Sequence, residues 1–158
     1  MTGRAAPIAV HEDTVVGEWI DRNGHLNLAY YLVLFDRATD VLFDRLGIGA
    51  AYSAASGYSL FVVETHTLYE RELALGARVR IDCHVLGADE KRLHLAHEMF
   101  RAGEAGRVAL LEGMVLHVDL GSRRTAPFPA AIAETLAGTV TSAPPAGLGR
   151  RISGLGRR

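Results

Sequence analysis

One amphipathic helix followed by a run of strands constrains the fold of this chain most strongly. From residue 28 to residue 46, apolar residues recur at three- and four-residue spacing, which is typical of a helix with one buried face. After Gly57 the period changes to two, and four strands are predicted, over residues 58–71, 77–86, 92–101 and 107–120. The order predicts an α+β domain in which one helix packs on a mostly antiparallel sheet.

The flanking segments complete the predicted domain. Residues 8–16 read as a short first strand, residues 48–57 as a loop or a short extra turn, and a short helix is expected from the Pro127 and Pro129 region to residue 137. A chain of 158 residues has the length of one domain, so we assign residues 1–138 to it. Residues 139–158 are rich in Gly, Pro and Ser and contain four arginines and no acid, which favours a disordered basic tail.

Charge and cysteine content exclude several classes of protein. The formal net charge of −1 gives no electrostatic basis for binding nucleic acid. Cys83 is the only cysteine, so no intrachain disulfide forms and nothing indicates an oxidising compartment. The apolar runs are shorter than the roughly 20 residues of a membrane span, and the first ten residues lack the apolar core of a signal peptide. We therefore expect a cytoplasmic protein that does not enter the membrane.

The turn before the long helix holds the strongest candidate for chemistry. Residues 19–27 read Trp-Ile-Asp-Arg-Asn-Gly-His-Leu-Asn, which places a carboxylate, Asp21, beside the expected helix start. Unpaired N–H groups and the positive end of the helix dipole lie there, and they can stabilise an oxyanion. Helix capping by Asp21 or Asn23 is the structural alternative. Both interpretations stay open on the residues alone.

The turn, Tyr30 and the order of elements resemble the hotdog-fold acyl-CoA thioesterases of the 4-hydroxybenzoyl-CoA thioesterase type. In that family an Asp-x-x-Gly-His-x-Asn-x-x-Tyr pattern precedes the central helix, and the resemblance covers roughly residues 8–130. It implies a long antiparallel sheet wrapped around one helix, hydrolysis of an acyl-CoA to free acid and CoA, and no cofactor beyond the CoA of the substrate.

A narrower resemblance is to the betainyl-CoA thioesterases of carnitine breakdown, some of which are fused to carnitine dehydrogenase. Three segments carry it: residues 63–66, residues 86–95, and residues 116–119 together with Arg123 and Arg124. The narrower resemblance implies a short polar acyl group, with betainyl-CoA as the substrate. An aromatic cage suits the trimethylammonium group of such a substrate.

The resemblance assigns Asp21 as the catalytic carboxylate, acting as nucleophile or as general base toward water. His25 and Asn27 then orient the turn or a water, although each equally suits a purely structural role. Glu64 is the second candidate carboxylate, since it lies two residues from His66 on one face of a predicted strand. The residues expected to bind substrate, including the CoA phosphates, are Trp19, Tyr30, His66, Tyr69, Arg123 and Arg124.

A metal site is not expected. His94 and His97 are three residues apart in a predicted strand, so their side chains face opposite sides of the sheet and cannot share an ion.

Two alternative functions and an oligomeric state remain to be stated. A hydratase or dehydratase acting on enoyl or hydroxyacyl thioesters uses the same fold, and so does a non-catalytic acyl-CoA-binding module. A single sheet leaves its edges and one face uncovered, so we expect a homodimer or homotetramer.

Overall fold

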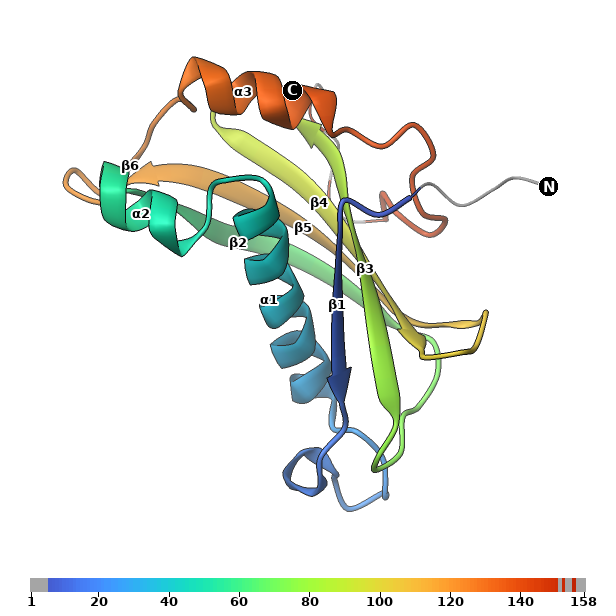
Figure 1. Ribbon diagram of the computed structural model, residues 1–158. Helices are drawn as coiled ribbons and strands as arrows, with labels where there is room; N and C mark the ends of the chain where they lie inside the picture. The colour runs from blue at the N-terminus through green and yellow to red at the C-terminus, as the bar shows by residue number, and fades with distance from the viewer. Residues whose placement is uncertain (1–5, 151, 153–154, 156–158) are drawn as a thin grey trace.

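The computed structural model describes residues 6–150, 152 and 155, which form a six-stranded sheet curled around one helix (Figure 1). The strands are β1 (Ala9–Thr14), β2 (Tyr58–Tyr69), β3 (Arg78–Ala88), β4 (Arg92–Arg101), β5 (Arg107–Asp119) and β6 (Arg124–Thr125). The helices are α1 (Leu28–Arg45), α2 (Ala50–Ser56) and α3 (Ala130–Gly138), with a 3-10 turn η1 (Gly17–Trp19). The predicted α+β hotdog architecture is confirmed.

The sheet is antiparallel throughout, in the order β1-β3-β4-β5-β2, and the short β6 pairs with β5. Strand β2 is therefore one edge, where its register on β5 shifts at a bulge between Val62 and Glu64. A bulge bends the strand and increases its twist. The four long strands confirm the periodicity of two.

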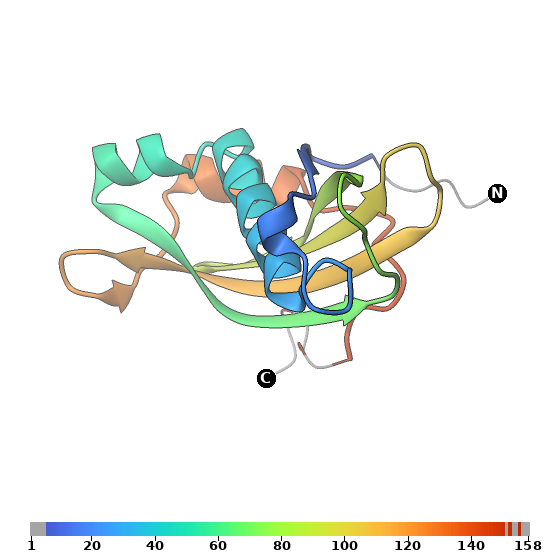
Figure 2. The same cartoon turned by 90° about the horizontal axis from the view of Figure 1, so that it is seen from below.

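Helix α1 lies on the inner, concave face of the sheet, and the core forms between them (Figure 2). Its 3.6-residue pattern turns Leu34, Phe35, Ala38 and Leu42 toward the sheet, where each is at most 1% exposed. Alternate residues of β3, β4 and β5 meet this helix face, which is how an antiparallel sheet packs one side.

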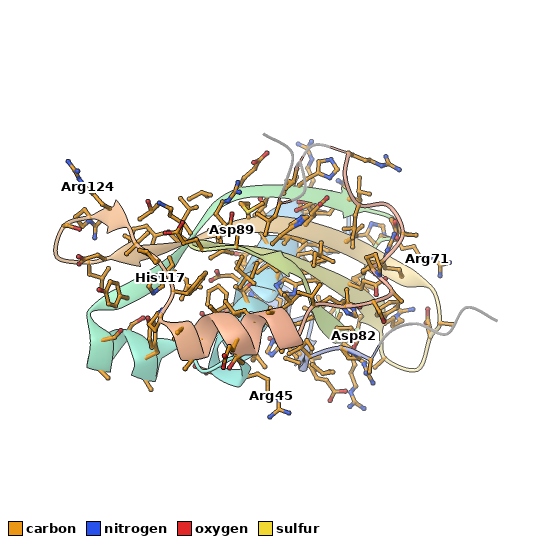
Figure 3. The ribbon with its side chains drawn as sticks, turned by 90° about the horizontal axis from the view of Figure 1, so that it is seen from above. Arg45, Arg71, Asp82, Asp89, His117 and Arg124 are labelled. Carbon is orange, nitrogen blue, oxygen red and sulfur yellow. The ribbon has the colours of Figure 1, made fainter. Side chains whose placement is uncertain are left out.

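Helix α2 lies in the segment expected to be a loop or an extra turn. It ends at Gly57, whose φ of 76° is the left-handed conformation that glycine adopts freely at a helix end. His117 of β5, labelled in Figure 3, joins this helix to the sheet. Its Nδ1 donates to the Ala126 carbonyl at 2.8 Å, so its Nε2 accepts from the Tyr52 hydroxyl at 2.8 Å.

The described residues after α3 differ from the expectation of a disordered tail. Thr141 N–H donates to Val85 O at 2.8 Å, Arg107 Nη1 donates to Ala146 O at 2.9 Å, and Gly149 N–H donates to Glu112 Oε2 at 2.8 Å. Ile152 is 2% exposed. This segment, residues 139–150 with 152 and 155, crosses the outer face of the sheet, and we call it the strap. Arg151, Arg157 and Arg158 of the predicted basic tail lie outside the described residues.

Within the described part of the chain, no helix is both long and apolar enough to span a membrane.

Candidate active site

Asp21 lies in a closed turn just before α1. Its N–H donates to His25 O at 2.9 Å, and its Oδ1 accepts from Asn23 N–H at 2.7 Å. An isolated bridge between Ile20 and Leu26 joins the two sides of the turn. The turn needs the left-handed residue Gly24, whose φ is 79°. Asp21 is thus held in a fixed position, and its second oxygen makes no hydrogen bond with the described residues.

Helix α1 is capped by Asn27 and not by Asp21 or Asn23. Asn27 Oδ1 accepts from Ala29 N–H at 3.0 Å, which is the N-cap arrangement. The capping alternative for Asp21 therefore does not hold at this helix, and the structural role proposed for Asn27 does.

The connection between β2 and β3, which includes residues 71–73, contacts the turn and the start of α1. Leu26 N–H donates to Leu73 O at 2.7 Å, and the Tyr31 hydroxyl donates to Arg71 O at 3.1 Å. Burial raises the pKa of Tyr31, so its hydroxyl keeps the proton that it donates. His25 Nε2 lies 3.3 Å from Glu72 Oε1. The turn is consequently fixed to a segment more than 40 residues away in the sequence.

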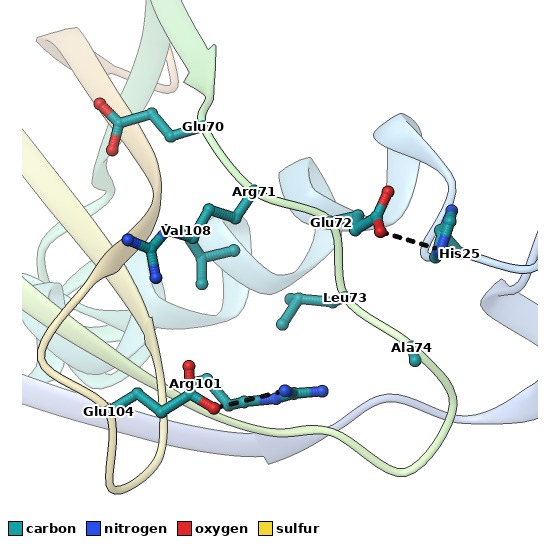
Figure 4. A pocket seen from close by; sticks show the side chains of 9 residues that line it. All are labelled: His25, Glu70, Arg71, Glu72, Leu73, Ala74, Arg101, Glu104 and Val108. Atoms are coloured by element: carbon teal, nitrogen blue, oxygen red, sulfur yellow. Dashed lines mark hydrogen bonds and ion pairs between the residues drawn. The ribbon is translucent and has the colours of Figure 1, made fainter.

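A cavity of about 530 Å³ opens beside the turn, between this connection and the β4–β5 hairpin (Figure 4). Figure 4 shows Glu72 pointing toward His25, and Arg101 paired with Glu104 at 3.3 Å. Arg71 makes no ion pair with the described residues, and its guanidinium lies over Gly106. The cavity therefore offers one guanidinium that is not neutralised by an ion pair.

Two aromatic pairs flank the start of α1. Trp19 stacks on Tyr30 with ring centroids 5.6 Å apart, and Tyr69 meets Tyr31 edge-on at 5.3 Å. Arg37 already holds its guanidinium 5.1 Å from the Trp19 ring centroid, in the position that a bound cation would take. Tyr69, at 46% exposed, is the most accessible of the aromatics predicted to bind substrate.

Glu64 and His66 share one face of β2, as predicted, but it is the outer face. Their neighbour Thr65 lines the groove beside α1, so the two flanking side chains point the opposite way. His66 lies opposite Glu112, which bonds to the strap. The structure therefore does not bring Glu64 and His66 to Asp21 of the same chain.

Arg123 and Arg124 lie at the other end of the sheet from the turn. Figure 3 shows Arg124 and Arg71 at opposite ends, and Arg71 belongs to the segment that holds the turn. Arg123 has a φ of 59°, and its guanidinium lies 5.4 Å from the Phe61 ring centroid. Within one chain these arginines are remote from Asp21.

His94 and His97 face opposite sides of the sheet, as the alternation of the strand predicted. His94 Nε2 lies 2.8 Å from Glu112 Oε1 on the outer face, whereas His97 Nε2 lies 2.9 Å from Thr39 Oγ1 on the inner face. No group of three or more potential metal ligands occurs among the described residues.

The sequence did not reveal Glu72, Leu73 or Tyr31 as parts of this site. Each of them contributes through a contact with a residue far away in the sequence. The sequence around Leu73 has no pattern that distinguishes it from an ordinary connection between two strands. The positive φ required at Gly24 was the one local signal that a fixed turn forms there.

A curled antiparallel sheet around one helix, with a fixed carboxylate turn at the helix start, defines a hotdog domain of the thioesterase kind. The chain belongs to the Thioesterase-like superfamily, whose family model matches residues 15–136. The prediction of a thioester hydrolase on this fold is thereby confirmed.

Individual relatives agree with this membership. A betainyl-CoA thioesterase of Pseudomonas aeruginosa is 41% identical over 149 residues, which cover 92% of this chain and 94% of that protein. An L-carnitine dehydrogenase/betainyl-CoA thioesterase of Agrobacterium fabrum is 40% identical over 82% of this chain, but the match spans only 26% of that longer protein. A Staphylococcus aureus protein solved in complex with CoA has a TM-score of 0.83 at 26% identity and covers 97% of this chain and 98% of that one.

Proposed function

We propose that the protein hydrolyses a short polar acyl-CoA, with betainyl-CoA as the substrate, and that Asp21 is the catalytic carboxylate. The observation that carries the proposal is the closed turn, which fixes Asp21 while leaving one carboxylate oxygen free of protein partners. The full-length similarity to the Pseudomonas aeruginosa betainyl-CoA thioesterase supports the choice of acyl group. Water and the thioester give the free acid and the CoA thiol, whether Asp21 attacks the carbonyl or activates the water.

The turn also limits which group can stabilise the oxyanion. Asn23 N–H is bound by Asp21 Oδ1, and Gly24 N–H donates to Asp21 O at 3.0 Å. Among the hydrogen bonds of the described residues, Arg22 N–H and His25 N–H have no acceptor, so two donors in the turn remain for a tetrahedral intermediate, and we assign this role to His25, which is nearer to the start of α1. His25 thus acts through its backbone, with its side chain directed to Glu72.

The trimethylammonium group of a betainyl substrate requires an aromatic face. Arg37 already occupies the cation position at Trp19, so we assign this contact to Tyr69 and leave Trp19 and Tyr30 as the wall behind Asp21. A Tyr face is expected to contribute about 0.5–2 kcal/mol to binding a cation.

The site is completed, in this proposal, by a second copy of the chain. Val62 and Val63 on the edge strand β2 are 45% and 53% exposed, and Leu32 and Val33 of α1 are each 38% exposed. Between them lies a largely apolar groove of about 470 Å³. A soluble protein buries such a patch by pairing, and an edge strand pairs readily with its own copy.

Antiparallel pairing of two β2 edges also gives Arg123 and Arg124 a role. In each chain, the Tyr58 end of β2 lies beside the arginine pair and the Tyr69 end beside the turn. Reversing the second strand brings its arginine end toward the first chain's turn, where the CoA phosphates would lie. Sedimentation tests this: Val63→Lys should give monomers with little activity, whereas Val10→Lys on the β1 edge should leave assembly unchanged.

Thiol release from a panel of acyl-CoAs tests the activity itself. Cys83 is fully buried, and burial raises its pKa to about 12, so the native protein adds no background with a thiol reagent. Betainyl-CoA should be cleaved fastest, and Asp21→Asn should lower kcat/KM on the order of 100-fold or more. The matched Asp40→Asn, an exposed carboxylate of α1, should retain activity.

The outcomes separate the rival functions. Inactivity of the wild-type protein on short, aromatic and betainyl thioesters, together with tight binding of CoA, would indicate a binding module. Hydration of a crotonyl thioester without thiol release would indicate a hydratase. Full activity of Asp21→Asn would leave the reaction in place and remove Asp21 from it.

A further inference from the structure

The outer face of the sheet holds a second cavity, of about 630 Å³, beneath the strap. Its walls are aliphatic and come from the end of β3, from α3 and from the strap: Leu86, Ala88, Ala137, Val140, Leu148 and Ile152. Its polar lining consists of His94 and Glu112, which are 7% and 2% exposed. A largely apolar pocket of this size with a few converging polar groups is typical of a small-molecule site.

This cavity is separate from the proposed catalytic turn. It lies near α3, at the top of Figure 1, whereas the segment between β1 and α1 that contains Asp21 lies at the bottom. Glu112 also faces away from α1, because its neighbour Leu111 lines the groove on the inner face. Nothing in the proposed thioesterase reaction uses either Glu112 or His94.

The bonds of Glu112 fix its orientation. Its Oε1 lies 2.8 Å from His94 Nε2, which must donate because a carboxylate accepts. Its Oε2 accepts from Gly149 N–H at 2.8 Å, and the φ of 76° at Gly149 is one that glycine adopts readily. The carboxylate therefore has donors on both oxygens and yet no arginine or lysine beside it in the described part of the chain.

The surrounding charges favour a cation over an anion. The other buried acids of this face have arginine partners: Asp82 lies 2.7 Å from Arg80, and Glu98 lies 3.1 Å from Arg107. Glu112 pairs with no arginine or lysine among the described residues, and its side-chain partner there is His94. A buried carboxylate without a cationic partner is costly, and a bound ammonium group would remove that cost.

We propose that the cavity beneath the strap binds a small aliphatic amine in its protonated form, with the ammonium group at Glu112 and the alkyl chain among the aliphatic walls. The ammonium group donates to the Glu112 carboxylate, whose oxygens have lone pairs to accept it beside the bonds from His94 and Gly149. The alkyl chain gains from burial against Leu86, Val140 and Leu148.

Titration with hexylammonium, followed by the ¹H–¹⁵N signal of the Gly149 amide, tests the proposal without any measurement of turnover. The Gly149 signal should shift saturably, with hexanol binding more weakly and hexanoate giving no saturable shift. Glu112→Gln should weaken hexylammonium binding about tenfold or more, because it removes the charge and nearly preserves the shape. Because Glu112→Gln can also loosen the strap, a second variant is needed that fills the cavity and leaves the Glu112 bonds to the strap in place.

Ala137→Trp, which fills the cavity from α3, should abolish binding while the signals of the strap stay dispersed. Its matched control is Ala131→Trp, on the same helix but outside the cavity lining, which should bind as the wild type does. Equal binding of hexanoate, unchanged binding by either Glu112→Gln or Ala137→Trp, or the lack of a saturable shift with the wild type would each overturn the proposal. A failed thioesterase assay would not affect it.

Discussion

The two faces of the sheet are buried by different means. The inner face is largely apolar and packs on α1, and His97, which is buried there, is held neutral: burial lowers its pKa to about 3. The outer face carries Asp82, His84, Glu98 and Glu112, all less than 9% exposed, and it is crossed by a strap without helix or strand of its own. Burial alone therefore does not distinguish a hydrophobic core from a covered polar layer, and the two should respond differently to substitution.

The largest difference is expected from deleting aliphatic side chains. Leu95→Ala on the inner face, where Leu95 is 1% exposed, should lower the free energy of unfolding by about 3 kcal/mol because it leaves a cavity in a packed core. Leu86→Ala on the half-buried outer side should cost about 1 kcal/mol. Urea denaturation measures both, and equal losses would mean that the strap covers a second true core.

The next largest effect should come from Arg107, which bonds to two carboxylates and to the strap. Arg107 donates two hydrogen bonds to Glu70, one to Glu98 and one to Ala146 O, and its bonds to Glu70 hold the pKa of that carboxyl below its usual range. Arg107→Ala should therefore destabilise the fold by about 2 kcal/mol and free the strap.

Limited proteolysis within the strap, together with urea denaturation, measures this effect. Arg101→Ala, which removes the exposed pair with Glu104, is the control and should change stability by no more than about 0.5 kcal/mol. A strap that stays protected in Arg107→Ala would show that its aliphatic contacts suffice to hold it.

The smallest expected effect is a pH dependence from the inner face. The pKa of His97 is about 3 in the folded protein and near 6.5 when unfolded, so between these values only the unfolded state takes up the proton. Stability should thus fall as the pH drops below 6.5, by at most about 1.4 kcal/mol per pH unit from this group. Urea denaturation of His97→Gln between pH 7 and pH 5 should show a shallower slope, while the control His66→Gln should keep it.

The inner face could be predicted from the sequence, and the outer face could not. Alternation in β3, β4 and β5 marks Ile81, Leu95 and Val115 as core directly. The intervening residues, such as Glu98 and Glu112, follow the same alternation as polar positions, and a polar residue in a strand normally faces water. Their cover comes from a Gly/Pro-rich segment about 37 residues further on, and no local pattern links the two.

The candidate site divides in a similar way. The Asp21 turn and the Asn27 cap lie within a few residues of each other, so local chemistry and the resemblance predicted that turn. Glu64 and His66 were placed correctly on one strand face, but the sequence does not say which side of the sheet that face meets. The support from Leu73 depends on a long-range contact, which only the fold supplies.

The strap has a consequence for the order of folding. It bonds to Val85 of β3 and to Glu112 of β5, so its docking sites exist only after the sheet has formed. During synthesis the outer face of the sheet therefore stays open to water until residues 139–155 have left the ribosome. Its row of carboxylates and imidazoles keeps that transient surface hydrated, whereas an aliphatic surface in its place would expose the nascent sheet to aggregation.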